Sequence, residues 1–259
     1  MEINKLRYKS AFKAMALHFG ASVFVAILVA LLVFVVWYPY PYREFAGGKE
    51  LFFLVMGVDL ICGPLLTFIL YNPAKPRREL FLDLSLVVVL QLAALGYGLW
   101  TVWVARPLFL VHEVDRFKVI AKADVDTLAL DKLIDGLQPK LFKGPQPVGL
   151  REINAKERET VMFESVQGGR DYGERPEFYA PYDEANAAKA YAKAKPIAKF
   201  INSVSAAKQS RQEQVTKIAL ESATAEDQLR FLPIIARQDW IAVLNAKGAI
   251  VGYIQGDGF

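Results

Sequence analysis

The hydrophobic and polar positions of this chain fall into two regimes that meet near residue 106. Before that point the chain holds three long runs that are almost free of charge, at about residues 19–38, 51–71 and 80–104. Each run has at least the ~20 residues that a helix needs to cross a ~30 Å hydrocarbon core. Because backbone groups find no water inside a bilayer, each run is predicted to be a transmembrane helix.

The second and third runs are predicted to form a helical hairpin. Residues 72–79 between them contain two prolines and four charged side chains, which end a helix and require water or lipid headgroups. Each run contains a single charged residue, Asp59 in the second and Asp83 in the third. An aspartate at the bilayer centre costs roughly 2.5–3.5 kcal/mol on insertion scales, so each needs a partner or a function.

The spacing around Lys75 suggests partners for these polar residues. Asp59 and Gln91 each lie sixteen residues from Lys75, and Thr67 and Asp83 each lie eight residues from it. Antiparallel helices place such residues at about the same depth, so both pairs are predicted to hydrogen-bond across the hairpin. Asp59 and Gln91 then either stabilise the bundle or leave Asp59 facing a groove that receives another membrane helix. An ion or proton path is the least favoured alternative, because one carboxylate is not a relay.

Small residues are predicted to mark the places where the two helices of the hairpin approach closely. Such residues let helix backbones come near one another in a membrane. The candidates are Gly57, Gly63, Ala94 and Gly98.

The distribution of Lys and Arg predicts the orientation of the chain. Residues 1–17 form a basic tail with four of them, residues 72–79 hold three, and the loop at 39–50 holds two. Because cytoplasmic loops are enriched in Lys and Arg, seven against two places the tail and the 72–79 turn in the cytoplasm. Three crossings then export residues 106–259, which places them in the periplasm if the source is a Gram-negative bacterium. An aromatic belt is expected at that outer interface: Trp37, Tyr38, Tyr40, Tyr42, Trp100 and Trp103.

Residues 106–259 predict an exported α+β domain that ends in a β-hairpin. Strand-like runs lie at both ends of the domain with helical patterns grouped between them, which is typical of α+β proteins. The expected strands are 108–112, 114–120, 145–153, 229–236, 240–245 and 249–255, and the expected helices are 126–137, 154–166, 183–194, 196–204 and 206–223. The one cysteine, Cys62, lies in the second membrane run as a packing residue, so the exported domain can form no disulfide.

A loop at residues 167–182 is rich in Gly, Pro, Tyr and Arg. Tyrosine and arginine are enriched in binding hot spots, and they also occur in ordinary packed loops. The loop is therefore either a structural connection or a surface that contacts a partner protein. Its candidate contact residues are Arg170, Tyr172, Arg175, Tyr179 and Tyr182.

The sequence contains no recognisable catalytic constellation. The chain has two histidines, no phosphate-binding or dinucleotide-binding glycine motif, and no serine in a nucleophile elbow. Neither a metal nor a cofactor is expected, and the protein is not expected to be an enzyme. The net charge of +4 lies largely beside the membrane runs, so no nucleic-acid partner is expected either.

Several short motifs, in their order and spacing, resemble the TfpX/TfpZ family of type IV pilin accessory proteins. They run from residue 17 almost to the end of the chain: Leu17-His-Phe-Gly-Ala-Ser22, Trp37-Tyr-Pro39, Gly57-Val-Asp-Leu60, Gly63-Pro-Leu-Leu-Thr67, Asp83-Leu-Ser85, Gln91-Leu-Ala-Ala94, Arg106-Pro107, Val114-Asp-Arg-Phe117, Phe163-Glu-Ser165, Arg175-Pro-Glu177 and Asp239-Trp240.

The resemblance implies a chaperone-like accessory protein of the inner membrane that assists the stability or assembly of one type IV major pilin, without enzyme activity or a cofactor. Its partners would be the bilayer, the transmembrane helix of the pilin and the pilin head. Asp59, Thr67, Asp83 and Gln91 are the candidate contacts for the pilin helix. The alternatives are a pilin-modifying membrane enzyme, which lacks its motifs here, and a membrane sensor with a periplasmic ligand domain, which lacks a cytoplasmic output domain.

The predicted orientation can be tested with reporter fusions. A reporter that is active only in the periplasm should be active when fused after Phe259 and silent when fused at Lys75, because the Lys and Arg excess keeps the turn in the cytoplasm. Activity in living cells, compared at equal fusion-protein level, checks the prediction. The reverse pattern would contradict the orientation.

Overall fold

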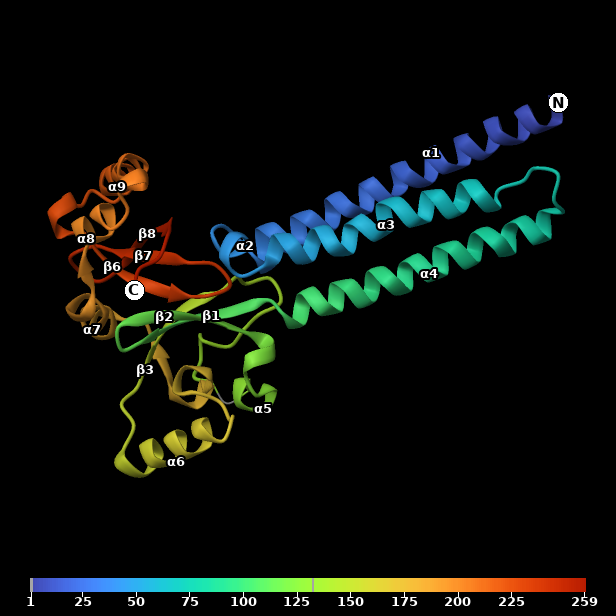
Figure 1. Cartoon of the computed structure of the whole chain (residues 1–259). Coiled ribbons are helices and arrows are strands. Elements are labelled where there is room, and N and C mark those ends of the chain that lie inside the picture. The colour runs from blue at the N-terminus through green and yellow to red at the C-terminus, as the bar shows by residue number, and fades with distance from the viewer. Residues whose placement is uncertain (1, 132) are drawn as a thin grey trace. The chain divides into compact units, whose positions relative to one another are not determined.

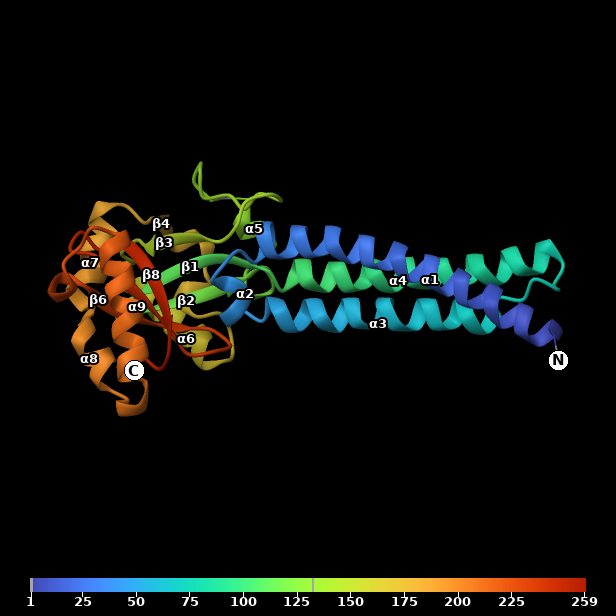
Figure 2. The ribbon, with the colours of Figure 1, turned by 90° about the horizontal axis from the view of Figure 1, so that it is seen from above.

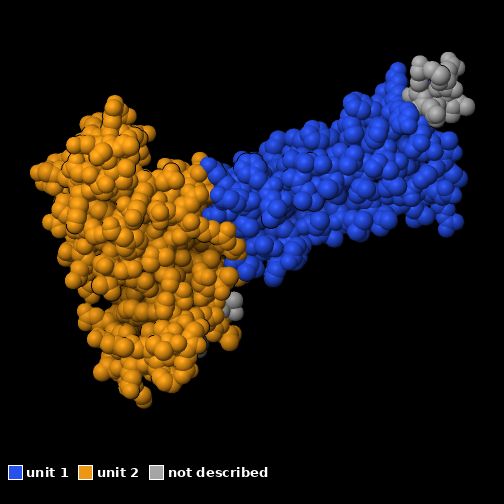
Figure 3. Space-filling view, in the orientation of Figure 1, with its two compact units in different colours: residues 1–39, 47–104 blue, residues 40–46, 105–259 orange. Residues whose placement is uncertain are grey.

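A computed structural model describes residues 2–131 and 133–259 of the chain. The chain divides into two compact units (Figure 3). The helical unit contains residues 1–39 and 47–104, and the sheet unit contains residues 40–46 and 105–259. The boundary near residue 105 agrees with the change in composition.

The helical unit consists of long helices (Figure 1). The first is α1 (Glu2–Leu31), which continues as the π-helical η1 (Leu32–Trp37), followed by α3 (Gly48–Leu70) and α4 (Arg77–Val104). Among the described residues, three helices are long and apolar enough to cross a membrane, at the three predicted places. The first helix is longer than expected: residues predicted as a basic tail are helical from Glu2 onward, because no proline or glycine interrupts them.

Helix α3 packs closely against both α1 and α4, whereas α1 and α4 approach one another less closely. Two of the four predicted small residues serve the contact between α3 and α4. A Cβ atom at Gly63 would overlap the Gln91 side chain, and one at Gly98 would overlap Val55. The prediction was wrong for Gly57, which has no such neighbour within 4 Å, and for Ala94, which is exposed.

Within the described residues of the sheet unit, eight strands form one mixed sheet. The path runs β4-β3-β1-β2-β6-β7-β8, and the short β5 also pairs with β6. The β1–β3 and β2–β6 pairs are parallel, and the other pairs are antiparallel. The strands are β1 (Pro107–Glu113), β2 (Arg116–Ala121), β3 (Gln146–Leu150), β4 (Tyr179–Pro181), β5 (Lys195–Pro196), β6 (Arg230–Ile235), β7 (Trp240–Leu244) and β8 (Ile250–Gln255).

The carboxy-terminal hairpin was predicted correctly. Strands β7 and β8 pair antiparallel, and the Gly248 N–H donates to the Asn245 carbonyl over 2.8 Å in the turn between them. Gly248 has φ +75°, a left-handed conformation that glycine adopts without the steric cost of a side chain.

The helices of the sheet unit are α2 (Tyr42–Phe45), α5 (Thr127–Leu130), α6 (Ala155–Val166), α7 (Glu184–Lys193), α8 (Ile197–Asn202) and α9 (Lys208–Glu221). They lie near the predicted positions, except for α2, which was not predicted, and α5, which is shorter than predicted. The helix predicted over 126–137 is wrong beyond Leu130. Turns follow Leu130, and Gly136 in them has a left-handed conformation. Leu133 and Leu137 lie in these turns, and their side chains are buried. Apolar spacing alone therefore mimicked a helix here.

The segment at residues 40–46, between the first two long helices, belongs to the core of the sheet unit. Phe45 is fully buried, with its ring 5.5 Å from that of Trp240, and its carbonyl accepts from the Arg237 N–H over 3.0 Å. Tyr42 is also buried there, near Tyr253, so its predicted place in an interfacial aromatic belt was wrong. This loop is thus part of the same folded unit as the residues that follow α4.

Removing the Phe45 side chain should therefore destabilise the sheet unit, although Phe45 lies sixty residues before Ala105, where the rest of that unit begins. Phe45→Ala should lower the free energy of unfolding by about 3–5 kcal/mol, the usual cost of emptying a buried aromatic site. Urea unfolding of the full-length protein in detergent checks this. Tyr40→Ala, in the same loop but 62% exposed, is the control and should change little. Equal losses for both variants would contradict the assignment.

Candidate functional site

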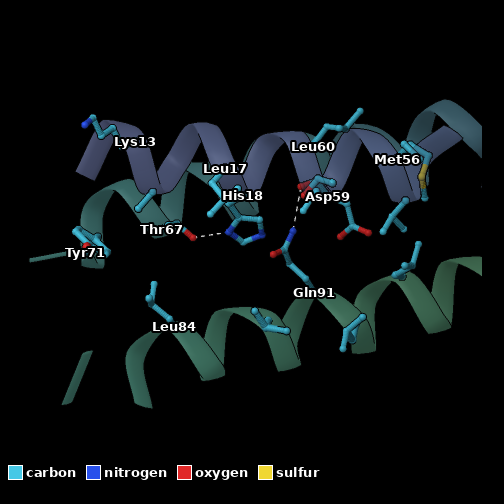
Figure 4. A pocket seen from close by; sticks show the side chains of 18 of the residues that line it. Lys13, Leu17, His18, Met56, Asp59, Leu60, Thr67, Tyr71, Leu84 and Gln91 are labelled. Carbon is cyan, nitrogen blue, oxygen red and sulfur yellow. Dashed lines mark hydrogen bonds between the residues drawn. The ribbon is translucent and has the colours of Figure 1, made fainter. Parts of the chain in front are cut away.

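A cleft of about 720 Å³ lies within the helical unit, between α1, α3 and α4 (Figure 4). It exists because α3 packs on both neighbours while α1 and α4 diverge. Its α1 wall is Ser10, Lys13, Ala14, Leu17, His18, Ala21, Ser22, Val25 and Ala26; α3 and the residue after it contribute Met56, Asp59, Leu60, Thr67 and Tyr71; and α4 contributes Leu84, Val88, Gln91, Leu92 and Leu95.

The two outer walls of the cleft differ in side-chain size. Five of the nine α1 residues are alanine or serine, so another backbone can come close to this wall. On α4 the residues at 84, 88, 91 and 95 follow a four–three–four spacing and form one stripe, with large apolar side chains around Gln91. Among the described residues α4 buries only Val87, Gly98 and Val102, so this stripe is at most half-buried: Leu84, Gln91 and Leu95 are half-buried and Val88 is exposed.

Asp59 and Gln91 meet as the sequence predicts, but through a different atom of Asp59. The Gln91 Nε2 donates to the backbone carbonyl of Asp59 over 3.1 Å (Figure 4). The predicted bond between the two side chains is not formed. The half-buried Asp59 carboxylate lines the cleft at the middle of α3, and no side chain among the described residues bonds to it. It is therefore available to a partner that enters the cleft.

His18 and Thr67 form the second polar contact of the cleft. The His18 Nδ1 lies 2.5 Å from the Thr67 Oγ1 and links α1 to α3 (Figure 4). Thr67 is almost fully buried. His18 was not among the predicted site residues. Its only signal was its position at the edge of the first uncharged run, at a depth comparable to that of Thr67 in the second.

Asp83 lies outside the cleft. Its carboxylate accepts from the Lys75 Nζ over 2.6 Å, and both side chains are about one-third exposed. The predicted bond between Thr67 and Asp83 was therefore wrong, since each has another partner. A lysine in the turn offers a charged donor, which a carboxylate prefers to a neutral hydroxyl.

In the sheet unit, two tyrosines of the 167–182 loop are tied into the fold. The Tyr179 hydroxyl donates to the Gly173 carbonyl over 2.6 Å, and its ring packs edge-on against Phe109. The Tyr182 hydroxyl donates to the Gly248 carbonyl over 2.8 Å. Burial raises the pKa of both phenols, so both stay neutral donors at ordinary pH.

The other candidate residues of this loop are divided between internal and exposed positions. The Arg175 Nε donates to the Arg170 carbonyl over 3.1 Å, and its guanidinium forms an ion pair with Glu164. The Tyr172 hydroxyl donates to the Arg151 carbonyl. Of the five candidates, only Arg170 is exposed; the others are buried or half-buried. Most of the loop is therefore better explained as a structural connection than as a surface that contacts a partner.

Metal chemistry has no evident location in the described part of the chain. No group of three or more His, Cys, Asp or Glu side chains converges there in a way that could hold a metal ion.

The hydrogen bonds of the cleft predict which residue pairs are energetically coupled. His18→Leu and Thr67→Val should be non-additive by about 0.6 kcal/mol, the average for polar pairs between membrane helices. Asp59→Leu and Gln91→Leu should instead be nearly additive, because Asp59→Leu keeps the carbonyl that Gln91 uses. Unfolding free energies of single and double variants in detergent measure both cycles. Coupling in the second cycle alone would contradict these hydrogen bonds.

Comparison with known proteins points to one family. A family model described as "Fimbrial assembly protein FimB" matches residues 6–47, which cover most of α1, all of η1 and the 40–46 segment. No solved structure matches the chain.

Three relatives from Dichelobacter nodosus illustrate the similarity. The chain is 34% identical to "Fimbrial assembly protein, serogroup I" over 99% of both chains, and 34% identical to the serogroup E1 protein over the same shares. It is 46% identical to the protein of serogroups C1 and C2, over 48% of this chain and 94% of that one. The similarity to the first two relatives spans the whole chain and indicates a role in pilus assembly. The protein therefore belongs to the fimbrial assembly protein family.

Proposed function

We propose that this protein is a chaperone-like accessory factor of the inner membrane that holds one type IV major pilin before or during its assembly. The hydrophobic helix of the pilin would lie in the cleft between α1, α3 and α4. The observation that carries this proposal is the Asp59 carboxylate, which lines the cleft at the middle of a membrane-length helix without a side-chain partner among the described residues. No catalytic reaction is part of the proposal.

The shape of the cleft supports a helix as its occupant. Lipid chains are as apolar as a hydrophobic helix, so helix association in a bilayer depends on close packing and polar bonds. The small side chains of the α1 wall allow close packing, and the Leu and Val stripe of α4 offers ridges on the opposite side. Asp59 provides the polar group, for which a donor on the incoming helix would offset part of the cost of placing a carboxylate at this depth.

The names of the relatives support a factor that is matched to one pilin type. Separate fimbrial assembly proteins are named for separate serogroups, including I, E1 and C1 with C2. In this proposal the helical unit recognises the pilin helix, and the sheet unit contacts the pilin head outside the cytoplasm. Arg170 is the candidate of the 167–182 loop whose exposed side chain suits such a contact.

Removing the carboxylate tests the polar part of the mechanism. Asp59→Leu should lower the amount of the matched pilin recovered with this protein by about 3- to 15-fold, the range that polar bonds between membrane helices allow. Asp83→Leu is the control, because Asp83 lies outside the cleft and pairs with Lys75. Pull-down from membranes at equal protein level, with pilus counts, measures the effect. If Asp59→Leu recovers as much pilin as the wild type does, the carboxylate has no role in binding the pilin.

Filling the cleft tests the steric part. Ala21→Phe should block the incoming helix, whereas Ala16→Phe makes the same change on the same helix at an exposed position that does not line the cleft. Only the first variant should lose pilin recovery and pili. If both variants recover the pilin as the wild type does, or if the wild type never recovers pilin, the cleft is not the pilin site.

A further inference from the structure

The sheet unit carries an exposed apolar tip between two lysines. The tip is Lys140-Leu-Phe-Lys143, which lies between α5 and β3 in a segment that projects from the sheet (Figure 2). The side chain of Phe142 is 75% exposed and that of Leu141 is 47% exposed. Leu141 and Phe142 are neighbours in sequence, so together they offer a small exposed apolar surface.

A buried arginine ties this tip to the place where the chain leaves α4. The Arg106 Nη1 donates to the Leu141 carbonyl over 3.3 Å and to the Lys140 carbonyl over 3.5 Å. Arg106 is only 3% exposed and follows Val104, the last residue of α4, by two positions. Two residues span at most about 7 Å of chain. The tip is therefore held, through bonds within the sheet unit, by the residue that follows the end of α4 by two positions.

The charges around the tip complement an anionic surface. The Lys143 ammonium donates to two neutral oxygens, the Gln146 Oε1 over 2.7 Å and the Gly136 carbonyl over 3.4 Å, which orient it without cancelling its charge. Lys140 is exposed. No carboxylate among the described residues forms an ion pair with either lysine. Two cations beside an exposed ring match lipid headgroups, where phosphates lie above an apolar layer.

We propose that the 140–143 tip docks on the lipid bilayer, at the face where α4 ends. Phe142 and Leu141 enter the headgroup layer, and Lys140 and Lys143 bind lipid phosphates. The tip anchors the sheet unit to the membrane surface at a second point beside the covalent exit from α4. Such an anchor restricts how the sheet unit can tilt, and it rests on none of the evidence for the pilin site.

A nitroxide label can measure the depth of the tip in the full-length protein. Cys62 is the only cysteine of the chain, so Cys62→Ala with Phe142→Cys gives a single labelling site. Phe163→Cys, on α6 and 65% exposed in the wild type, is the matched control. In vesicles of phosphatidylethanolamine and phosphatidylglycerol, oxygen should relax the label at 142 more strongly than a water-soluble nickel chelate does. The label at 163 should show the opposite order.

Two results of this measurement would overturn the proposal. Equal access of the nickel chelate to positions 142 and 163 places the tip in water. A label at 142 shielded from both reagents indicates a protein contact instead of lipid.

Charge reversal tests the lysines separately. Lys140→Glu with Lys143→Glu should lower the oxygen-to-nickel ratio at position 142 at least about twofold in anionic vesicles, because the acidic side chains are repelled by lipid phosphates. Lys217→Glu, on the exposed face of α9, is the control and should leave the ratio unchanged. An unchanged ratio in the double variant overturns the role assigned to the lysines.

Discussion

Close packing of α3 against α4 is the interaction on which the cleft depends. Gly63 lies where any side chain would overlap Gln91, and Gly98 lies where any side chain would overlap Val55. These glycines bring α4 near enough for Gln91 to bond to the Asp59 carbonyl, while α1 packs elsewhere on α3. The cleft is thus a consequence of one central helix with two partners that approach each other less closely. Helices in a bilayer gain little from apolar burial alone, so such glycine contacts matter more there than in a water-soluble core.

The polar groups of the helical unit are satisfied to different degrees, and this difference gives the cleft its chemical character. His18 bonds to Thr67, Gln91 bonds to a backbone carbonyl, and Asp83 bonds to Lys75 near the turn. The Asp59 carboxylate, at the middle of α3, lacks such a side-chain partner among the described residues. A carboxylate costs little free energy in water but much in hydrocarbon. An Asp59 carboxylate without an internal side-chain partner therefore fits a site in which another chain supplies that partner. Membership of the fimbrial assembly protein family supplies the context of pilus assembly.

The sheet unit is built from two distant parts of the chain. Phe45 and Tyr42, which precede α3, complete the core beside Trp240 and Tyr253. Residues 40–46 therefore connect η1 to α3 in sequence, while Tyr42 and Phe45 belong to the core of the sheet unit. The family model that matches residues 6–47 covers this connection together with the first helix, so the similarity extends over both units.

The sequence by itself determined the long helices, the composition boundary, the β7–β8 hairpin and the depth at which Asp59 meets Gln91. Each of these follows from local properties, namely uncharged length, turn residues and equal distance from Lys75. Only the tertiary structure decided that Gln91 bonds to the Asp59 carbonyl and not to its carboxylate. It also decided that Asp83 pairs with Lys75, and that Thr67 bonds to His18. It also decided that Tyr42 and Tyr179 are buried and that the helix expected over 126–137 ends at Leu130. The physical reason is that each outcome depends on competition among side chains that the fold brings together from distant segments, and such competition leaves no pattern along the chain.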